Sequence, residues 1–87
     1  MEKTIFSPTY RAFLRELKQA RRRSGLTQTE LAAKLGETQS FVSKCERGER
    51  RLDVIELRYF VQAMGISFVD FVTRLDEALS RKRGSGA

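Results

Sequence analysis

The residues between two expected helices in the middle of the chain constrain its fold most strongly. The apolar pattern of one helix ends at Leu35, and Thr38 is a good N-cap for the next, so the link holds only Gly36 and Glu37 between them. Gly36 can adopt the left-handed conformation that ends a helix at little steric cost. A glycine turn this short favours a steep crossing, in which one helix protrudes and the other braces it.

Similar start and stop signals divide the chain into five helices, and no alternating strand pattern competes with them. The expected caps are Ser7 before Pro8, Thr27 with Glu30, Thr38, Asp53 with Glu56, and Ser67 with Asp70. The expected fold class is all-α, a compact five-helix domain over residues 8–80. Residues 1–7 are expected to form a flexible N-terminal arm and residues 81–87 a flexible C-terminal tail.

Composition argues against several classes of protein. The chain has one cysteine and no histidine, so neither an internal disulfide nor a Cys/His metal cluster is expected, and no cofactor is implied. Without histidine there is no evident nucleophile and base pair, so we expect no enzyme. No apolar run approaches the roughly 20 residues of a membrane span, and the N-terminus lacks a signal peptide pattern. A cytoplasmic protein that does not enter membranes is expected.

Charge is distributed unevenly along the chain. The net charge is +6; residues 1–26 hold seven Lys or Arg against two acids, whereas residues 53–80 hold two against five. An anionic partner would therefore be attracted to the first half. A merely solvated surface would account for the excess equally well.

The segment LTQTELAAKLGETQSFVSKCERGERR carries a family resemblance that covers residues 10 to about 75. It resembles the Cro and phage-repressor (XRE) type of helix-turn-helix domain, and so implies a lambda-repressor-like DNA-binding domain. Two departures are Glu37, where the family usually has Val or Ile, and the missing proline after the ERGERR loop. Neither lies at a position expected to face DNA.

The resemblance implies that the helix over residues 38–46 enters the major groove of a double-stranded DNA operator. Gln can bond N6 and N7 of adenine, and Lys can reach O6 and N7 of guanine. Gln39, Ser40 and Lys44 are the expected base contacts, and Ser43 is a base or phosphate contact. Gln28, Arg47, Arg50 and Arg51 are the expected phosphate contacts, with Arg11, Arg22 and Arg23 as weaker candidates.

Two structural expectations accompany these assignments. Matching positions in phage-repressor domains imply an ion pair, mostly buried, between Arg21 and Glu46. Cys45 stands where the family usually has Ile, on an inner face with Phe41 and Val42, and is expected to be an inert core residue. A redox switch at Cys45 is the alternative.

A homodimer on a palindromic operator is expected, because one recognition helix covers only a few base pairs. The last helix carries more apolar side chain than one small core is expected to absorb. Its stripe, the expected dimer interface, is Phe68, Phe71, Val72, Leu75 and Leu79. The alternative is that the whole stripe belongs to the core.

The leading functional hypothesis is a sequence-specific transcriptional regulator, most simply a repressor or autoregulator. The same small fold would serve an antitoxin with a toxin partner, or the controller of a restriction-modification operon. A protein-interaction adaptor is the third hypothesis, but the expected outer face of residues 38–46 lacks the exposed aromatic side chains that a docking surface favours.

Overall fold

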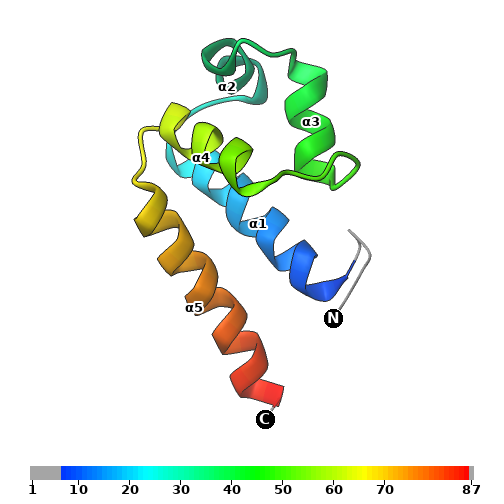
Figure 1. The fold of residues 1–87 in the computed structure, drawn as a ribbon, viewed down its shortest axis with the longest axis vertical. Coiled ribbons are helices and arrows are strands. Elements are labelled where there is room, and N and C mark those ends of the chain that lie inside the picture. Colours follow the sequence, from blue (N-terminus) through cyan, green and yellow to red (C-terminus); the bar gives the residue numbers. More distant parts are fainter. Residues whose placement is uncertain (1–6, 87) are drawn as a thin grey trace.

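The computed structural model describes residues 7–86, with side chains through residue 81, and this range forms five helices connected by short turns (Figure 1). The helices are α1 (Pro8–Arg23), α2 (Gln28–Leu35), α3 (Gln39–Arg47), α4 (Val54–Ala63) and α5 (Phe68–Gly86). The all-α class expected from the sequence is confirmed. Residues 1–6 of the expected arm and Ala87 lie outside the described range.

Polar caps begin the first four helices where the sequence predicts them. Ser7 Oγ accepts from the backbone N–H of Tyr10 ahead of α1. Capping boxes stand before α2 and α4, where Thr27 pairs with Glu30 and Asp53 with Glu56. Each box satisfies two backbone donors that the first turn of a helix otherwise leaves free.

The turn between α2 and α3 has the steep crossing that its length predicts. Gly36 ends α2 in the left-handed region at φ 70°, and the N–H of Glu37 returns to the carbonyl of Ala32 at 2.9 Å. Figure 1 shows α2 nearly along its axis and α3 from the side. Glu37 is exposed, so its replacement of the usual apolar residue leaves no charge buried in the turn.

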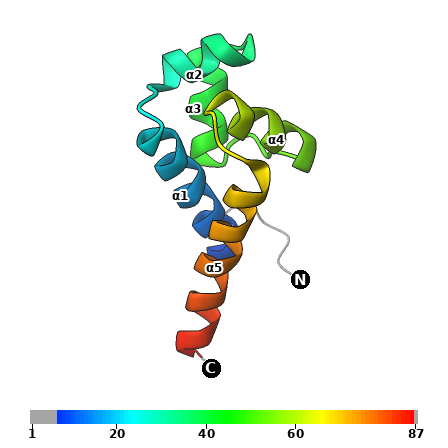
Figure 2. The ribbon, with the colours of Figure 1, turned by 90° about the vertical axis from the view of Figure 1, so that its left-hand side faces the viewer.

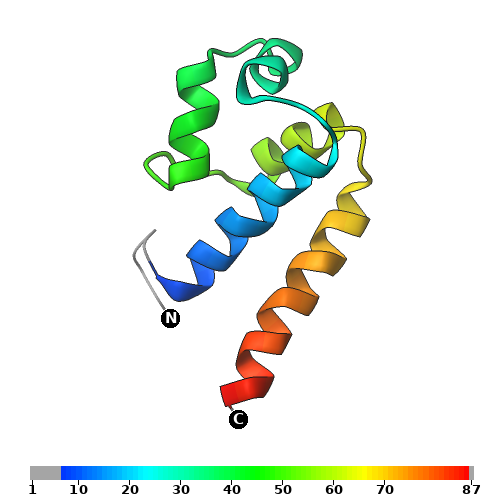
Figure 3. The same ribbon diagram turned by 180° about the vertical axis from the view of Figure 1, so that it is seen from behind.

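One core joins all five helices. Its most deeply buried side chains are Leu17, Leu31, Val42, Cys45, Phe60, Val61 and Phe71. Full burial of such an apolar side chain contributes about 1.5–3 kcal/mol. Phe71 brings α5 into this core, and its ring meets the ring of Phe13 edge-on at 6.4 Å. α5 thus packs alongside α1, as seen from behind in Figure 3.

The last helix is longer than the sequence analysis predicted. The expected domain ended at residue 80, with a tail from 81, but α5 continues to Gly86 and its final turns extend beyond the other helices (Figure 2). A helix already anchored through Phe71 extends at one hydrogen bond per added residue. Within residues 7–86, no helix has both the length and the apolar character needed to cross a membrane.

Candidate nucleic-acid interface

A buried ion pair connects α1 to the end of α3. Arg21 Nε donates to Glu46 Oε2 at 2.6 Å, and Arg21 Nη2 donates to Glu46 Oε1 at 3.0 Å. The two side chains are only 9% and 3% exposed. A third donor, Nη1, bonds the carbonyl of Leu26 at 2.9 Å. The hydrogen bonds to Glu46 raise the pKa of Arg21 above its ordinary value, with the negative charge of Glu46 adding to them and burial opposing both.

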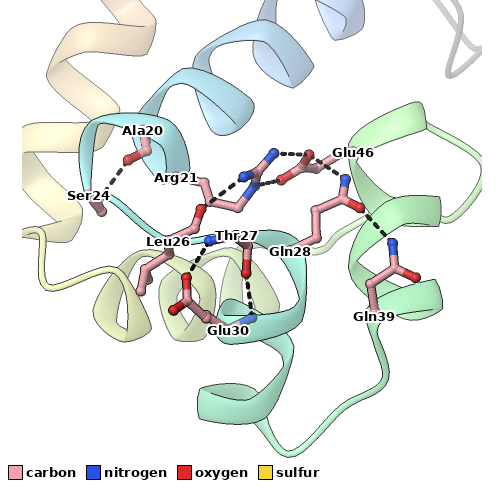
Figure 4. Close-up of polar contacts among 9 residues, drawn as sticks. All are labelled: Ala20, Arg21, Ser24, Leu26, Thr27, Gln28, Glu30, Gln39 and Glu46. Carbon is pink, nitrogen blue, oxygen red and sulfur yellow. Dashed lines mark hydrogen bonds and ion pairs between the residues drawn. The ribbon is translucent and has the colours of Figure 1, made fainter.

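Two glutamines extend this pair to the surface of the molecule. Gln28 Nε2, at the start of α2, donates to Glu46 Oε1 at 2.9 Å. Gln39 Nε2, at the start of α3, donates to Gln28 Oε1 at 2.7 Å. Figure 4 shows the continuous chain from Arg21 through Glu46 and Gln28 to Gln39. A surface amide on α3 is therefore held by contacts that reach α1.

The outer face of α3 is polar and open. Gln39, Ser40 and Lys44, the three expected base contacts, are all exposed. Ser43 is half-buried, and its hydroxyl accepts a short hydrogen bond from Arg47 Nη1. The side chains near the N-terminus of α3 therefore face solvent, while Val42 on the other side is fully buried.

Two arginines, one at the end of α3 and one in the loop after it, form exposed ion pairs that were not predicted from the sequence. Arg47 Nε bonds Glu49 Oε2 at 2.7 Å, and Arg50 Nη2 bonds Glu56 Oε2 at 2.7 Å. These hydrogen bonds raise the pKa of each arginine and lower the pKa of each glutamate. No regular helical spacing relates the partners, so only the course of the loop reveals the pairs.

Arg50 and Arg51 each lie over an aromatic ring. The Arg50 guanidinium lies 5.1 Å from the ring centroid of Phe41, and that of Arg51 lies 4.6 Å from the centroid of Tyr10. A guanidinium within about 6 Å of a ring face is attracted to it. Of the four expected phosphate contacts, Gln28 is half-buried and is held by hydrogen bonds to Glu46 and Gln39. The other three, Arg47, Arg50 and Arg51, are exposed. Arg11, Arg22 and Arg23 are exposed on α1.

Cys45 lies in the core directly before Glu46. Its side chain has no exposed surface, and burial raises the pKa of its thiol to about 11, although the charge of Arg50 acts in the opposite direction. A thiol with a pKa this high forms little thiolate near neutral pH.

The stripe expected as a dimer interface is divided between core and surface. Phe71 is 2% exposed and packs in the core, so this side chain is not available to meet a counterpart in a second copy. Phe68, Leu75 and Leu79 are half-buried, and Val72 is exposed. Leu75 and Leu79 also line a groove of about 300 Å³ with side chains of α1.

Exposed apolar residues also occur where the sequence analysis did not place an interface. Val69 on α5 is 70% exposed, and Val54, Ile55 and Tyr59 on α4 are each at least 58% exposed. Val54 stands three residues before the buried Leu57, a spacing that usually places two residues on one face of a helix. It lies in the first turn of α4, immediately after the Asp53 cap, where it remains outside the core.

Comparisons with known proteins agree with this geometry. A family model described as helix-turn-helix matches residues 17–71. An uncharacterized HTH-type transcriptional regulator of Sinorhizobium fredii, y4dJ, is 47% identical over 57 residues, which are 66% of this chain and 74% of that protein. The structure of an XRE-family like protein from Pseudomonas syringae pv. tomato has a TM-score of 0.74 and 48% identity, covering 79% of this chain and 84% of that one. The chain belongs to the XRE-type helix-turn-helix family.

Proposed function

We propose that this protein is a sequence-specific, double-stranded DNA-binding transcriptional regulator that inserts α3 in the major groove. The observation that carries the proposal is the exposed polar start of α3, where Gln39 is tied through Gln28 to a buried ion pair. Such a helix presents fixed donors and acceptors to base edges. Membership of the family and the printed description of the Sinorhizobium relative as a transcriptional regulator support the same function.

The proposed contacts fall into two groups. Gln39, Ser40 and Lys44 contact bases, with Ser43 at the edge of this set. Gln28, Arg47, Arg50 and Arg51 contact phosphates, which supply affinity without sequence preference. Gln28 can bond a phosphate because only one of the two N–H groups of its Nε2 is used in the bond to Glu46. Repression or autoregulation is the proposed role; an antitoxin with a toxin partner, or a restriction-modification controller, would use the same contacts.

Binding measurements on two variants test the proposal. Gln39→Ala is expected to lose about 1–3 kcal/mol on the selected operator and little on random DNA, because it removes a base contact. Arg50→Ala is expected to weaken both DNAs alike and to reduce the salt slope by about one. Titrations of both variants on both DNAs at several salt concentrations distinguish these effects. Equal weakening of both DNAs by Gln39→Ala would refute its assignment as a base contact.

We also propose that the regulator binds a palindromic operator as a homodimer, through the exposed and half-buried apolar residues of α5. Phe68, Val72, Leu75 and Leu79 remain candidates, while Phe71 belongs to the monomer core. A two-fold axis would pair this surface with itself and place two α3 helices about 34 Å apart. Leu75→Glu is then expected to give a folded monomer with far weaker operator binding. Sedimentation showing a 10.0 kDa species that binds the operator tightly would contradict the dimer.

A further inference from the structure

The groove between α1 and α5 has apolar walls. Its volume of about 300 Å³ is near the lower limit for sites that bind small molecules. Tyr10 and Phe13 of α1, whose ring centroids are 5.1 Å apart, line one side, and Leu75 and Leu79 of α5 line the other. All four side chains are half-buried, so each leaves apolar surface open to the groove. The groove can therefore take up an apolar chain from solvent.

Among the described residues, one charged side chain lines this groove, that of Arg51. Its guanidinium lies 4.6 Å from the centroid of the Tyr10 ring, and the Tyr10 hydroxyl accepts from the backbone N–H of Leu52 at 3.3 Å. Tyr10 thus holds both the guanidinium and the loop that carries it. The lining residues at the start of α1, Ser7 and Thr9, are uncharged, and the first turn of α1 has no acidic side chain.

Arg51 differs from the two arginines before it in its partners. Arg47 and Arg50 each pair with a glutamate, whereas Arg51 has no acidic partner in the part of the chain that the structure describes. Its contact with the tyrosine ring uses the face of the guanidinium, so the N–H donors in the plane remain for an acceptor. The groove therefore offers a positive charge and hydrogen-bond donors at the side of an apolar surface.

We propose that this groove binds a medium-chain monocarboxylate, with the carboxylate on Arg51 and the apolar chain between α1 and α5. The planar guanidinium matches a carboxylate through two parallel N–H···O bonds. A single lining cation favours a ligand with one negative charge, and the apolar walls favour a chain of methylene groups. A neutral chain or a small hydrophilic anion would use only one of these two features.

The ligand also acts on DNA binding, a step that rests on the proposed function. Arg51 is a proposed phosphate contact, so a carboxylate on its guanidinium competes with a phosphate for the same donors. Leu75 and Leu79 belong to the proposed dimer surface as well, so an occupied groove opposes dimerisation. Ligand and DNA therefore weaken each other's binding by the same factor.

Octanoate is the probe for the groove, and 1-octanol, which has the same chain length without a charge, is its control. Titrations at constant ionic strength, followed by NMR of the leucine methyl groups, give the site and the Kd. Leu75 and Leu79 are expected to shift, whereas Leu35, half-buried beside another hollow, should not. Octanoate is expected to bind about tenfold more tightly than 1-octanol. From hexanoate to decanoate, affinity should rise about two- to fourfold per methylene.

Variants of Arg51 test the contribution of its charge. Arg51→Gln is expected to reduce the affinity for octanoate to that for 1-octanol. Arg51→Lys keeps the charge but not the planar fork, and should give an intermediate affinity. Arg58→Gln, an exposed change on α4, is the matched control and should leave octanoate binding unaltered. Because Arg51 is itself exposed, its variants should fold like the unmutated protein.

Competition with DNA is measured on random duplexes, because phosphate contacts do not depend on sequence. Saturating octanoate is expected to weaken binding about three- to tenfold at low salt and to reduce the salt slope by about one. Arg51→Gln, whose own affinity for DNA should be lower, is expected to keep the same salt slope with and without octanoate. 1-Octanol should leave the salt slope of the unmutated protein unchanged.

Three outcomes would overturn the proposed site. In one, octanoate shifts Leu35 as much as Leu75 and Leu79; in another, 1-octanol binds as tightly as octanoate. In the third, Arg51→Gln retains the full affinity for octanoate. Octanoate that occupies the groove without weakening DNA binding would overturn the link to regulation. A protein that binds no DNA would overturn the proposed function instead, and the octanoate titrations would still decide whether the groove is a site.

Discussion

Arg21 and Arg50 each hold a glutamate through two contacts, yet the two pairs lie in opposite environments. Arg21 and Glu46 are 9% and 3% exposed, whereas Arg50 and Glu56 are 43% and 31% exposed. In the buried pair, water cannot replace a lost partner, so the geometry is fixed. In the exposed pair, water and phosphates compete for the guanidinium, so the contact is exchangeable. Similar bonding thus fixes the geometry of the side chains in one region and leaves a guanidinium exchangeable in the other.

The largest expected effect is on the rate at which a thiol reagent labels Cys45, which lies in the buried region. Because this thiol has no exposed surface and its pKa is raised to about 11, it should react only when the domain opens. Labelling of the native protein by a thiol reagent is expected to be at least about a thousandfold slower than that of the urea-unfolded chain. Fast labelling of the native protein would favour the redox switch and would show that this region is not closed.

Glu46→Gln tests the fixed character of the buried pair directly. Neutralising Glu46 strands the Arg21 charge in the interior and is expected to lower the free energy of unfolding by about 3–5 kcal/mol. Urea denaturation measures the loss. Glu56→Gln is the matched control, since glutamine retains the capping box before α4, and it should change stability little. A loss below about 3 kcal/mol in Glu46→Gln would count against a closed, buried pair.

Removing the exposed ion pairs should change the affinity for DNA more than it changes stability. Glu49→Gln and Glu56→Gln replace the ion pairs of Arg47 and Arg50 with weaker neutral contacts and remove negative charge near the proposed phosphate contacts. Affinity for random DNA is expected to rise about two- to fivefold at low salt, and the gain should shrink at high salt. Thr73→Val, an exposed change on α5, is a control that should leave affinity unaltered. Unchanged binding by both glutamate variants would mean that these arginines do not meet phosphates.

The smallest effect is the acid response of the exposed pairs. Contacts to Arg47 and Arg50 lower the pKa values of Glu49 and Glu56 in the folded protein. Stability from these groups is therefore complete above their ordinary pKa of 4.5 and is lost as pH falls through the lower folded values. The melting temperature should be level from pH 7 to about 5 and decline below about 4.5. The decline should be shallower in the double variant Glu49→Gln, Glu56→Gln, and equal slopes would contradict this assignment.

Local signals made most of the fold predictable. Capping boxes such as Thr27 with Glu30 act within one helical turn, so sequence spacing alone locates them. The left-handed Gly36 turn is equally local, and it fixes how α2 and α3 cross. Local signals did not locate the end of α5, which continues past the expected boundary at residue 80 to Gly86.

Contacts between distant residues were less accessible from the sequence. The Arg21 and Glu46 pairing spans 25 residues and was expected only because of the family resemblance. The pairing of Arg50 with Glu56 depends on the course of the loop after Gly48, which spacing does not determine. Apolar periodicity indicated a stripe on α5 but not its division, in which Phe71 is core and Val72 is exposed. That division depends on how closely α1 packs against α5.

Glu56 has a second hydrogen-bond partner besides Arg50. Its Oε1 accepts from Arg50 Nη1 at 2.8 Å and also from the backbone N–H of Asp53 at 3.0 Å, as part of the box that starts α4. If a DNA phosphate displaces Glu56 from Arg50, as the proposed phosphate contact implies, Glu56 still has this backbone partner at the positive end of the helix dipole. The exchange of partners by Arg50 would therefore leave the first turn of α4 intact.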